Sequence, residues 1–397
     1  DQRRSVVERC LAEQVQNLKV RVNFEADPAR RLLMRVALLG AAIAFEKPKE
    51  EIERYLDRAL LGLERQIDEM GLHRSRNIEE QFLLLLEMIP VRHAVTPIAP
   101  NRGQVFANVL ERMHRCLAMM MHTTGELAFF NNTRAVPHEL LLAVQSRASG
   151  ALDLETGKLA SGYGMLLGNN SKLLLDSGVS MGEDFGDHIH AGGASFEFST
   201  RNDLIVSNCG PGPMSFGDDR ALFKLPATHT SLEIEYAGKY PHKSDKILAA
   251  HISGNAQQKI SFDAGDHRFD IKNLGYLSLA GVEHRRSINM LRREGDAVLG
   301  QDHIKCDMSH KHAPDELLLR FHLGPGVQAE INEEQTQIRL VLRSGAHWVF
   351  IWEGASAMVE ASARYSPHKG LAETQQIVLS TTAKPEQEIV WTFAPSP

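Results

Sequence analysis

Residues 185–200 read FGDHIHAGGASFEFST and end in the alternating stretch ASFEFST. Side chains that alternate between apolar and polar are typical of a β-strand with one buried face. The same period of two recurs from about residue 159 to the C-terminus, in short runs bounded by Gly, Asn, Asp and Pro. We therefore predict a large antiparallel β-sandwich over residues 156–397.

The first 155 residues follow a different pattern, because their apolar residues recur at helical spacing. Pro28, Pro48 and Pro137 stand at or near expected helix starts, where the missing N–H of proline costs nothing. Short connections between helices favour antiparallel helical hairpins. Six helices are expected, at residues 4–18, 28–46, 48–70, 77–95, 102–122 and 137–147. The fold class predicted is α+β, with helical hairpins first and the sandwich second.

Composition limits the classes of function. The 397 residues carry a formal net charge of −6, which argues against general binding of nucleic acid or anionic membranes. The four cysteines lie far apart without a CxxC pair, so neither a disulfide framework nor a zinc ribbon is expected. The longest apolar run contains Arg35 and is too short for a transmembrane helix. No signal peptide is visible, although the chain begins at Asp1 rather than at a methionine.

His188 and His190 raise the most specific chemical question in the chain. On a strand, side chains at i and i+2 share a face, so we expect the two imidazoles to project the same way. Such a pair can bind one metal ion, divide its labour between metal and substrate, or make ordinary hydrogen bonds at a sheet edge. Asn208 and His229 follow on what we expect to be neighbouring strands and could converge with His190.

Three further groups of polar residues have a structural and a functional interpretation. Asn77 could cap the helix that follows it, or could bind a carboxylate together with Arg74 and Arg76 at the positive end of that helix. The adjacent residues Asn131 and Asn132 could form a turn, and the stretch NNT at 131–133 is formally a glycosylation sequon. Alternation around residues 283–291 places some basic side chains, Arg286 among them, on one face of the sandwich, and this face could also be an ordinary solvated one.

Several motifs, taken in order, resemble the heparinase II/III family of bacterial polysaccharide lyases, and most closely its uncharacterised proteobacterial branch. The likeness covers nearly all of the β half and is weaker in the helical half. The motifs that carry it are GLHRSRN (71–77), ELAFFNN (126–132), SGYGMLLGNNSKLLLDSG (161–178), DHIHAGGASFEFS (187–199), LIVSNCG (204–210), ATHTSLEIE (227–235), EHRRSINML (283–291), LRFHLGPGV (319–327) and TQQIVLS (374–380).

The resemblance implies a partial α/α toroid packed on an antiparallel β-sandwich, with a cleft for an acidic, glycosaminoglycan-like polysaccharide. The reaction would be β-elimination at a uronic acid. Asn77 would neutralise the carboxylate and His188 would transfer the proton. His190 and His229, with Asn208, would bind a structural zinc ion. Arg74, Arg76, Asn131, Asn132 and Arg286 are the expected substrate-binding residues.

Three departures from the family pattern bear on this reading. No tyrosine lies between Tyr55 and Tyr163, although the family's catalytic tyrosine is expected in that interval, so Tyr163 is the candidate substitute. Asn208 stands where several members have a metal-binding Asp, which removes a charge from the metal site. Six helices are also fewer than the family's toroid has, so we expect an N-terminal segment to be missing.

Three functions therefore compete. The first is a lyase that acts on a uronate-containing glycan. The second is a non-catalytic glycan-binding or cell-envelope protein of the same fold that has lost the catalytic tyrosine. The third is a structural zinc protein. The sequence leaves open the polysaccharide, the oligomeric state, and whether the compartment is the periplasm, the cell envelope or the cytoplasm.

Overall fold

In the computed structural model the chain divides into two compact units, and each is described by itself. The structure describes residues 2–148, 159–160, 162–177, 188–235, 256–262, 267–366 and 370–396. One unit contains Asp1–Ser75, Glu79–Ala118 and Glu139–Asp153, and the other contains Arg76–Ile78, Met119–His138 and Leu154–Pro397. The predicted domains differ from these units, because 76–78 and 119–138 lie within the helical half of the sequence yet belong to the second unit.

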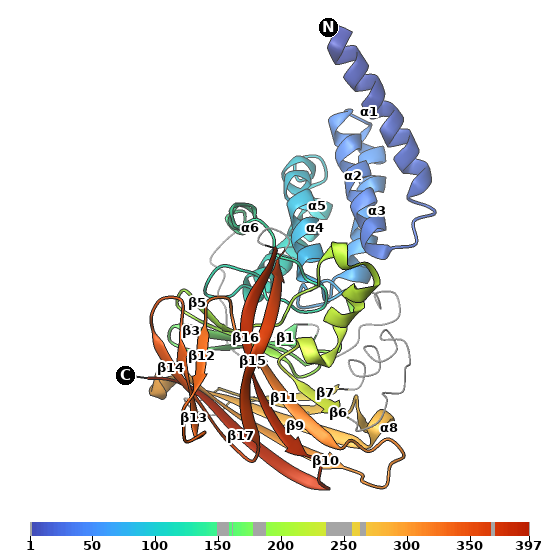
Figure 1. Ribbon diagram of the computed structural model, residues 1–397. Coiled ribbons are helices and arrows are strands. Elements are labelled where there is room, and N and C mark those ends of the chain that lie inside the picture. The colour runs from blue at the N-terminus through green and yellow to red at the C-terminus, as the bar shows by residue number, and fades with distance from the viewer. Residues whose placement is uncertain are drawn as a thin grey trace. The chain divides into compact units, whose positions relative to one another are not determined.

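The helical half contains the six expected helices (Figure 1). They are α1 (Gln2–Arg21), α2 (Pro28–Ala44), α3 (Lys49–Gln66), α4 (Ile78–Val95), α5 (Pro100–Met119) and α6 (His138–Gln145). Pro28 is the first residue of α2, and the Asp27 carboxylate before it accepts from the backbone N–H groups of Ala29 and Arg30. None of the helices in the described ranges is long and apolar enough to cross a membrane.

Two antiparallel sheets form the predicted sandwich (Figure 1). The eight-stranded sheet has the order β12-β13-β14-β17-β10-β9-β8-β7, and the four-stranded sheet has the order β15-β16-β11-β6. The strands are β6 (Leu232–Glu235), β7 (Ala256–Phe262), β8 (His267–Asn273), β9 (Val282–Leu291), β10 (Ala297–Cys306), β11 (Glu316–His322), β12 (Gln328–Ile331), β13 (Gln337–Val341), β14 (His347–Glu353), β15 (Ser356–Ser366), β16 (Gly370–Thr382) and β17 (Glu386–Pro395). Short helical segments occur at η2 (Met214–Lys224), η3 (Pro226–Thr228), α8 (Leu277–Ala280) and η4 (Arg292–Glu294).

Aromatic side chains fill the space between these two sheets. Phe321 on β11 packs edge-on against Trp391 on β17, with ring centroids 4.9 Å apart. Phe196 stacks on Trp391 at 5.3 Å and also contacts Phe321, with ring centroids 6.2 Å apart. Since β11 and β17 belong to different sheets, these contacts place the core between the sheets, as a sandwich requires.

A third sheet of five strands carries buried polar side chains on one of its faces. Its order is β1-β2-β3-β4-β5, with β1 (Leu159–Ala160), β2 (Tyr163–Leu167), β3 (Ser171–Asp176), β4 (Phe196–Thr200) and β5 (Asp203–Val206). Leu173, Leu175 and their apolar neighbours on one face join the sandwich core. Alternation turns Lys172, Glu197 and other buried polar residues to the opposite face, where they bond to residues of the 119–138 segment.

The two histidines are not on a strand, which corrects the prediction. Strand β4 begins at Phe196, and residues 188–195 form an irregular, mostly buried segment before it. Asp187 lies outside the described residues. The segment contains two glycines and Ala194, whose φ of +64° is not that of a strand residue, and pairing with β3 begins only at Ser195, whose carbonyl accepts from the Asp176 N–H.

Candidate functional site

Asn77 is held in place through the residues on both sides of it. The Tyr163 hydroxyl donates to the backbone carbonyl of Arg76 at 2.7 Å, and the Ile78 N–H donates to Thr133 Oγ1 at 3.0 Å. Arg76 has a φ of +58°, a left-handed conformation that bends the chain just before Asn77. The backbone of Asn77 is therefore fixed independently of its own side chain.

The Asn77 amide lies beside the His188 ring. Its Nδ2 is 3.3 Å from His188 Nδ1 and also donates to the Asn132 carbonyl at 3.3 Å. With the amide as donor, His188 Nδ1 is the acceptor, and the neutral ring carries its proton on Nε2. Asn77 is buried, whereas His188 is only half-buried, so the imidazole is the more accessible member of this pair.

Asn131 and Asn132 form the centre of a type I′ turn. Their φ angles are +47° and +65°, and the Thr133 N–H donates to the Phe130 carbonyl at 2.9 Å. Asparagine tolerates this left-handed conformation better than most residues, which explains the repeated Asn. The turn interpretation of this pair is therefore confirmed, and it leaves the two side chains with different surroundings.

Asn131 points into the interior and does not offer its amide to a substrate. Its Nδ2 donates to the Tyr163 hydroxyl at 2.6 Å and to Asp176 Oδ2 at 2.8 Å, while its Oδ1 accepts from the His190 N–H at 3.1 Å. Asp176 also forms an ion pair with the buried Arg76. Both side chains are buried and engaged within the protein, and the substrate-binding roles of Asn131 and Arg76 stay predictions.

Asn132 is the half-buried member of the turn. It contacts Arg220, a residue that the sequence analysis did not single out. Arg220, from η2, donates through Nη2 to Asn132 Oδ1 at 3.1 Å and through Nε to the Pro211 carbonyl at 3.3 Å. Gly217, inside η2, has φ +55° and ψ −125°, which kinks the segment. We call Asn77, Asn132, His188 and Arg220 the Asn77–His188 cluster.

Tyr163 is not placed to replace the family tyrosine. It is fully buried, and its hydroxyl donates to the Arg76 carbonyl while accepting from Asn131. Burial raises the pKa of Tyr163 far above its ordinary value, which disfavours the phenolate that a general base would require. Its hydroxyl fixes the backbone before Asn77, and its catalytic role stays a prediction.

Arg286 is also fully buried, and its predicted role in substrate binding stays a prediction. Its Nε donates to Asp302 Oδ1 at 2.7 Å, and both side chains have no exposed surface. Its Nη1 donates to the carbonyls of Ala194 and Thr230 at 2.8 and 2.9 Å. Arg286 therefore fixes the segment after His190 and the residue after His229, from within the sandwich.

His190 and His229 contact each other directly. Their Nδ1 and Nε2 atoms are 3.2 Å apart, and His229 Nδ1 lies 2.8 Å from the Leu225 carbonyl. This carbonyl can only accept, so His229 carries its proton on Nδ1 and presents a lone pair at Nε2 toward His190. Burial lowers the pKa of both rings, which keeps them neutral near pH 7.

These two nitrogens resemble part of a zinc site, but the described residues do not complete one. The Asn208 amide is occupied, since Oδ1 accepts from the Thr230 N–H at 3.0 Å and Nδ2 donates to the Phe129 carbonyl at 3.3 Å. No group of three or more His, Cys, Asp or Glu side chains suited to a metal is found in the described part of the chain. Structural zinc prefers four such ligands, so this donor set does not fit, and zinc binding stays a prediction.

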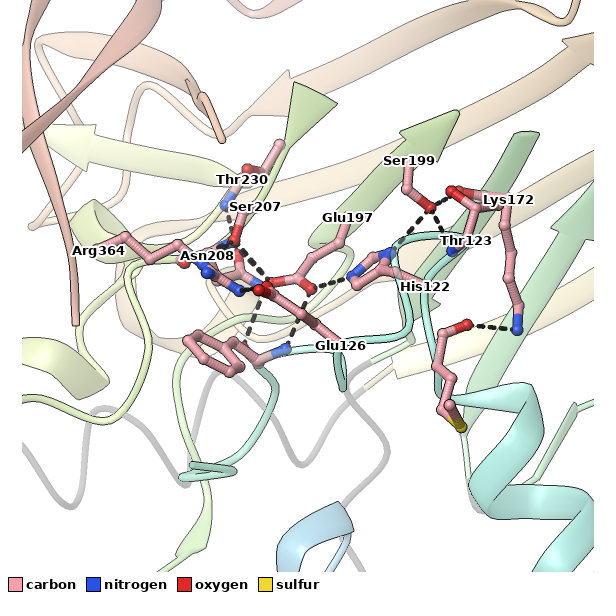
Figure 2. Close-up of polar contacts among 12 residues, drawn as sticks. His122, Thr123, Glu126, Lys172, Glu197, Ser199, Ser207, Asn208, Thr230 and Arg364 are labelled. Atoms are coloured by element: carbon pink, nitrogen blue, oxygen red, sulfur yellow. Dashed lines mark hydrogen bonds and ion pairs between the residues drawn. The ribbon is translucent and has the colours of Figure 1, made fainter. Parts of the chain in front are cut away.

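A buried carboxylate, Glu197, joins the segments around the site (Figure 2). Oε2 accepts from His122 Nε2 at 2.7 Å and from the Phe129 N–H at 3.0 Å. Oε1 accepts from the Asn208 N–H at 2.8 Å and, more weakly, from the Ser207 hydroxyl at 3.4 Å. The alternation of β4 points this side chain away from the apolar core, but the sequence pattern alone gave it no partners.

The family of the chain follows from a comparison with known families. A family model described as "Heparinase II/III-like, C-terminal" matches residues 158–392, more than half of the chain. The chain belongs to the heparinase II/III-like family. No curated protein matches the sequence.

Solved structures share this heparinase-like fold along almost the whole chain. A crystal structure titled heparinase III has a TM-score of 0.74 and 14% identity, and the match covers 98% of this chain and 64% of that one. The heparan sulfate lyase HepC from Pedobacter heparinus has a TM-score of 0.72 and 13% identity, with 92% of this chain and 59% of that chain covered. The chain thus has a polysaccharide-lyase-like fold and spans less than two thirds of either neighbour.

Within this heparinase-like fold, the structure brings together only some of the predicted site residues. Asn77, His188 and Asn132 are adjacent, and His190 contacts His229. Arg74 belongs to the helical unit, so its role in substrate binding stays a prediction.

Proposed function

We propose that this protein acts on a uronic-acid-containing glycan by β-elimination, with the Asn77–His188 cluster as its active site. The observation that carries the proposal is the 3.3 Å approach of an amide donor, Asn77 Nδ2, to a half-buried imidazole, His188. The solved structures of similar fold support the choice of substrate class, because their titles name heparinase III and a heparan sulfate lyase.

Two donors of the cluster suit a sugar carboxylate. Asn77 Nδ2 would turn from His188 to the carboxylate, and Arg220 would add a positive charge from the side of Asn132. Withdrawing charge from the carboxylate acidifies the neighbouring C5 proton, because the carbanion-like state delocalises onto the carboxylate oxygens. Asn77 would thus stabilise the carbanion-like transition state more than the bound substrate, because negative charge develops on the carboxylate oxygens there.

His188 would carry the proton. Its neutral ring accepts the proton from C5, the C5–H electron pair forms the C4=C5 double bond, and the C4–O bond breaks. The imidazolium then returns the proton to the departing oxygen, so atoms and charge balance with one acid/base residue. This sequence requires the C5 proton and the leaving oxygen on the same face of the sugar ring, which makes it a syn elimination.

The test is an assay of the ultraviolet absorbance of C4=C5-unsaturated uronates, with a panel of uronate polymers incubated with and without added zinc. We expect product from at least one polymer, and loss of at least about 100-fold in kcat when His188→Ala removes the acid/base group. His347→Ala is the matched control, since His347 is exposed on β14 and outside the cluster. Absence of product from every polymer would contradict the proposal.

One observation favours a second candidate, a glycan-binding protein without catalysis. The Tyr163 hydroxyl is buried and engaged, so it cannot supply the phenol that the family pattern places at such a site. Under this alternative, His188→Ala would leave glycan affinity nearly unchanged and no polymer would be cleaved. Binding and absorbance measured on the same samples separate the two functions.

A further inference from the structure

A polar pocket lies in the sandwich unit, lined by residues that the Asn77–His188 cluster does not use. Its cavity volume is about 200 Å³. Its lining comes from the 119–138 segment, the β4–β5 turn, two sandwich turns and strands β15 and β16. These residues are Thr124, Glu126, Asn202, Asp203, Leu204, Pro325, Arg343, Arg364, Ser366, Gly370 and Ala372.

Three nearly buried polar residues of this lining have unused hydrogen-bonding capacity. Arg364, Asp203 and Ser366 are only 5%, 5% and 6% exposed. Arg364 bonds to Ser207 and Glu126 through Nε and Nη2, which leaves Nη1. Asp203 accepts from the Ser344 N–H through Oδ1, which leaves Oδ2. Among the described residues, neither of these atoms nor the Ser366 hydroxyl has a hydrogen-bond partner.

Arg364 Nη1, Asp203 Oδ2 and the Ser366 hydroxyl belong to residues that line the pocket, so they offer hydrogen bonds to a polar occupant. Thr124 adds a fourth group, since its Oγ1 is buried without a partner in the described part of the chain. Together they offer a guanidinium donor, a carboxylate acceptor and two hydroxyls, and this mixture complements the hydroxyls of a sugar, each of which donates and accepts.

The charge of the lining is balanced. Arg343 and Arg364 oppose Glu126 and Asp203, and the Arg364–Glu126 pair is already in contact at 3.3 Å. An anionic ligand would gain no net attraction from such a set, whereas a neutral polyol can satisfy donors and acceptors together. The pocket therefore differs in chemistry from the cluster around Asn77, where donors prevail.

We infer that this pocket binds a neutral sugar ring of the glycan, as a secondary binding site for a chain whose uronate is processed at the Asn77–His188 cluster. The inference rests on the proposed function only in taking a glycan as the natural ligand. Figure 2 shows the contacts that extend from this pocket: Arg364 contacts Ser207, and Ser207 contacts the Glu197 carboxylate, which also accepts from the Asn208 N–H.

Saturation-transfer NMR with methyl α-glucoside tests the inference, and sodium glucuronate serves as the anionic comparison. We expect the glucoside to bind and the glucuronate to bind more weakly. Asp203→Asn keeps the bond to Ser344 but turns the acceptor Oδ2 into a donor, and Ser366→Ala removes one hydroxyl. Each variant should weaken glucoside binding about fivefold, the effect of one hydrogen bond.

The control is Ser309→Ala, an exposed serine in the β10–β11 connection, which should leave glucoside binding unchanged. All measurements are repeated in the His188→Ala background, where this pocket is intact and turnover is absent, so failure of the lyase proposal does not affect the result. Three results would overturn the inference: no binding of the glucoside, unchanged glucoside affinity in Asp203→Asn and Ser366→Ala relative to the parent protein, or tighter binding of glucuronate than of glucoside.

Discussion

At the scale of single residues, the contacts of Tyr163 and Asn77 assign them different tasks. Tyr163 fixes the Arg76 carbonyl, and the Asn77 amide beyond it reaches His188. The family resemblance carried by GLHRSRN and DHIH implied catalytic roles for both Asn77 and His188, but it did not show that they are adjacent. Arg220 was not expected, because nothing near it in sequence indicates that η2 returns to the Asn131–Asn132 turn.

Tyr163→Phe separates a positioning role from a catalytic one. The variant removes the donor to the Arg76 carbonyl, so we expect it to lower the free energy of unfolding by about 1–3 kcal/mol, the cost of an unsatisfied buried group. Chemical denaturation measures this loss, with Tyr365→Phe as the control, since the Tyr365 hydroxyl has no hydrogen bond to a described residue. Loss of all turnover with unchanged stability would instead assign Tyr163 to catalysis.

Lys172 predicts a pH dependence of stability. Burial lowers its pKa to about 7, and Nζ donates to the Met121 carbonyl at 2.5 Å. In the unfolded chain the lysine regains its ordinary pKa near 10.4, so the unfolded state binds the proton more tightly. Burying the charged lysine therefore lowers the free energy of unfolding by its full amount below about pH 7. This loss of stability decreases as the pH rises from about 7 toward 10.

Lys172→Met should therefore raise the free energy of unfolding at pH 7, and its advantage over the parent protein should shrink between pH 7 and 10. Urea denaturation at several pH values measures this, with the exposed Lys384→Met as the control. A difference that stays constant over this pH range would show that Lys172 does not titrate with a lowered pKa.

At the scale of secondary-structure elements, periodicity predicted the helices and most strands, but it misplaced the histidine segment. The alternation in ASFEFST does mark β4, whereas DHIH precedes the strand. The reason is local. Two glycines and Ala194, which has a left-handed backbone conformation, interrupt the strand, and the alternation of side chains does not report backbone conformation. Periodicity also gave no sign that 119–138 covers the polar face of the five-stranded sheet, since that depends on contacts distant in sequence.

Glu197→Gln tests how this polar face is held. Both carboxylate oxygens of Glu197 accept hydrogen bonds, whereas an amide presents one acceptor and one NH₂ group. In either orientation of the glutamine amide, its NH₂ group would face a backbone N–H, that of Phe129 or that of Asn208, which now donates to Glu197 (Figure 2). We expect a loss of about 2–4 kcal/mol of folding free energy.

Denaturation of Glu197→Gln should be compared with that of Glu388→Gln, which makes the same change at an exposed position on β17. A loss within about 0.5 kcal/mol at both positions, the range expected of surface substitutions, would contradict the role assigned to Glu197.

At the scale of the whole molecule, the order of helices before sandwich and the family were predictable from the motifs, whereas the division into units was not. Residues 76–78 and 119–138 belong with the sandwich, and they supply Asn77 and the Asn131–Asn132 turn. The site is thus assembled in one unit from segments far apart in sequence. Which of the predicted residues point inward, as Arg286 and Asn131 do, depends on that assembly and not on their spacing.

The central claim is that Asn77 and His188 act together on one uronate, and one measurement tests it most directly. Unsaturated-uronate absorbance is followed with the parent protein, Asn77→Ala, His188→Ala and the control His347→Ala on the uronate polymer that gives the strongest signal. We predict turnover by the parent and the control, and a loss of at least about 100-fold in kcat in each of the other two. Full turnover by Asn77→Ala or His188→Ala, or none by the parent on any polymer, would contradict the account.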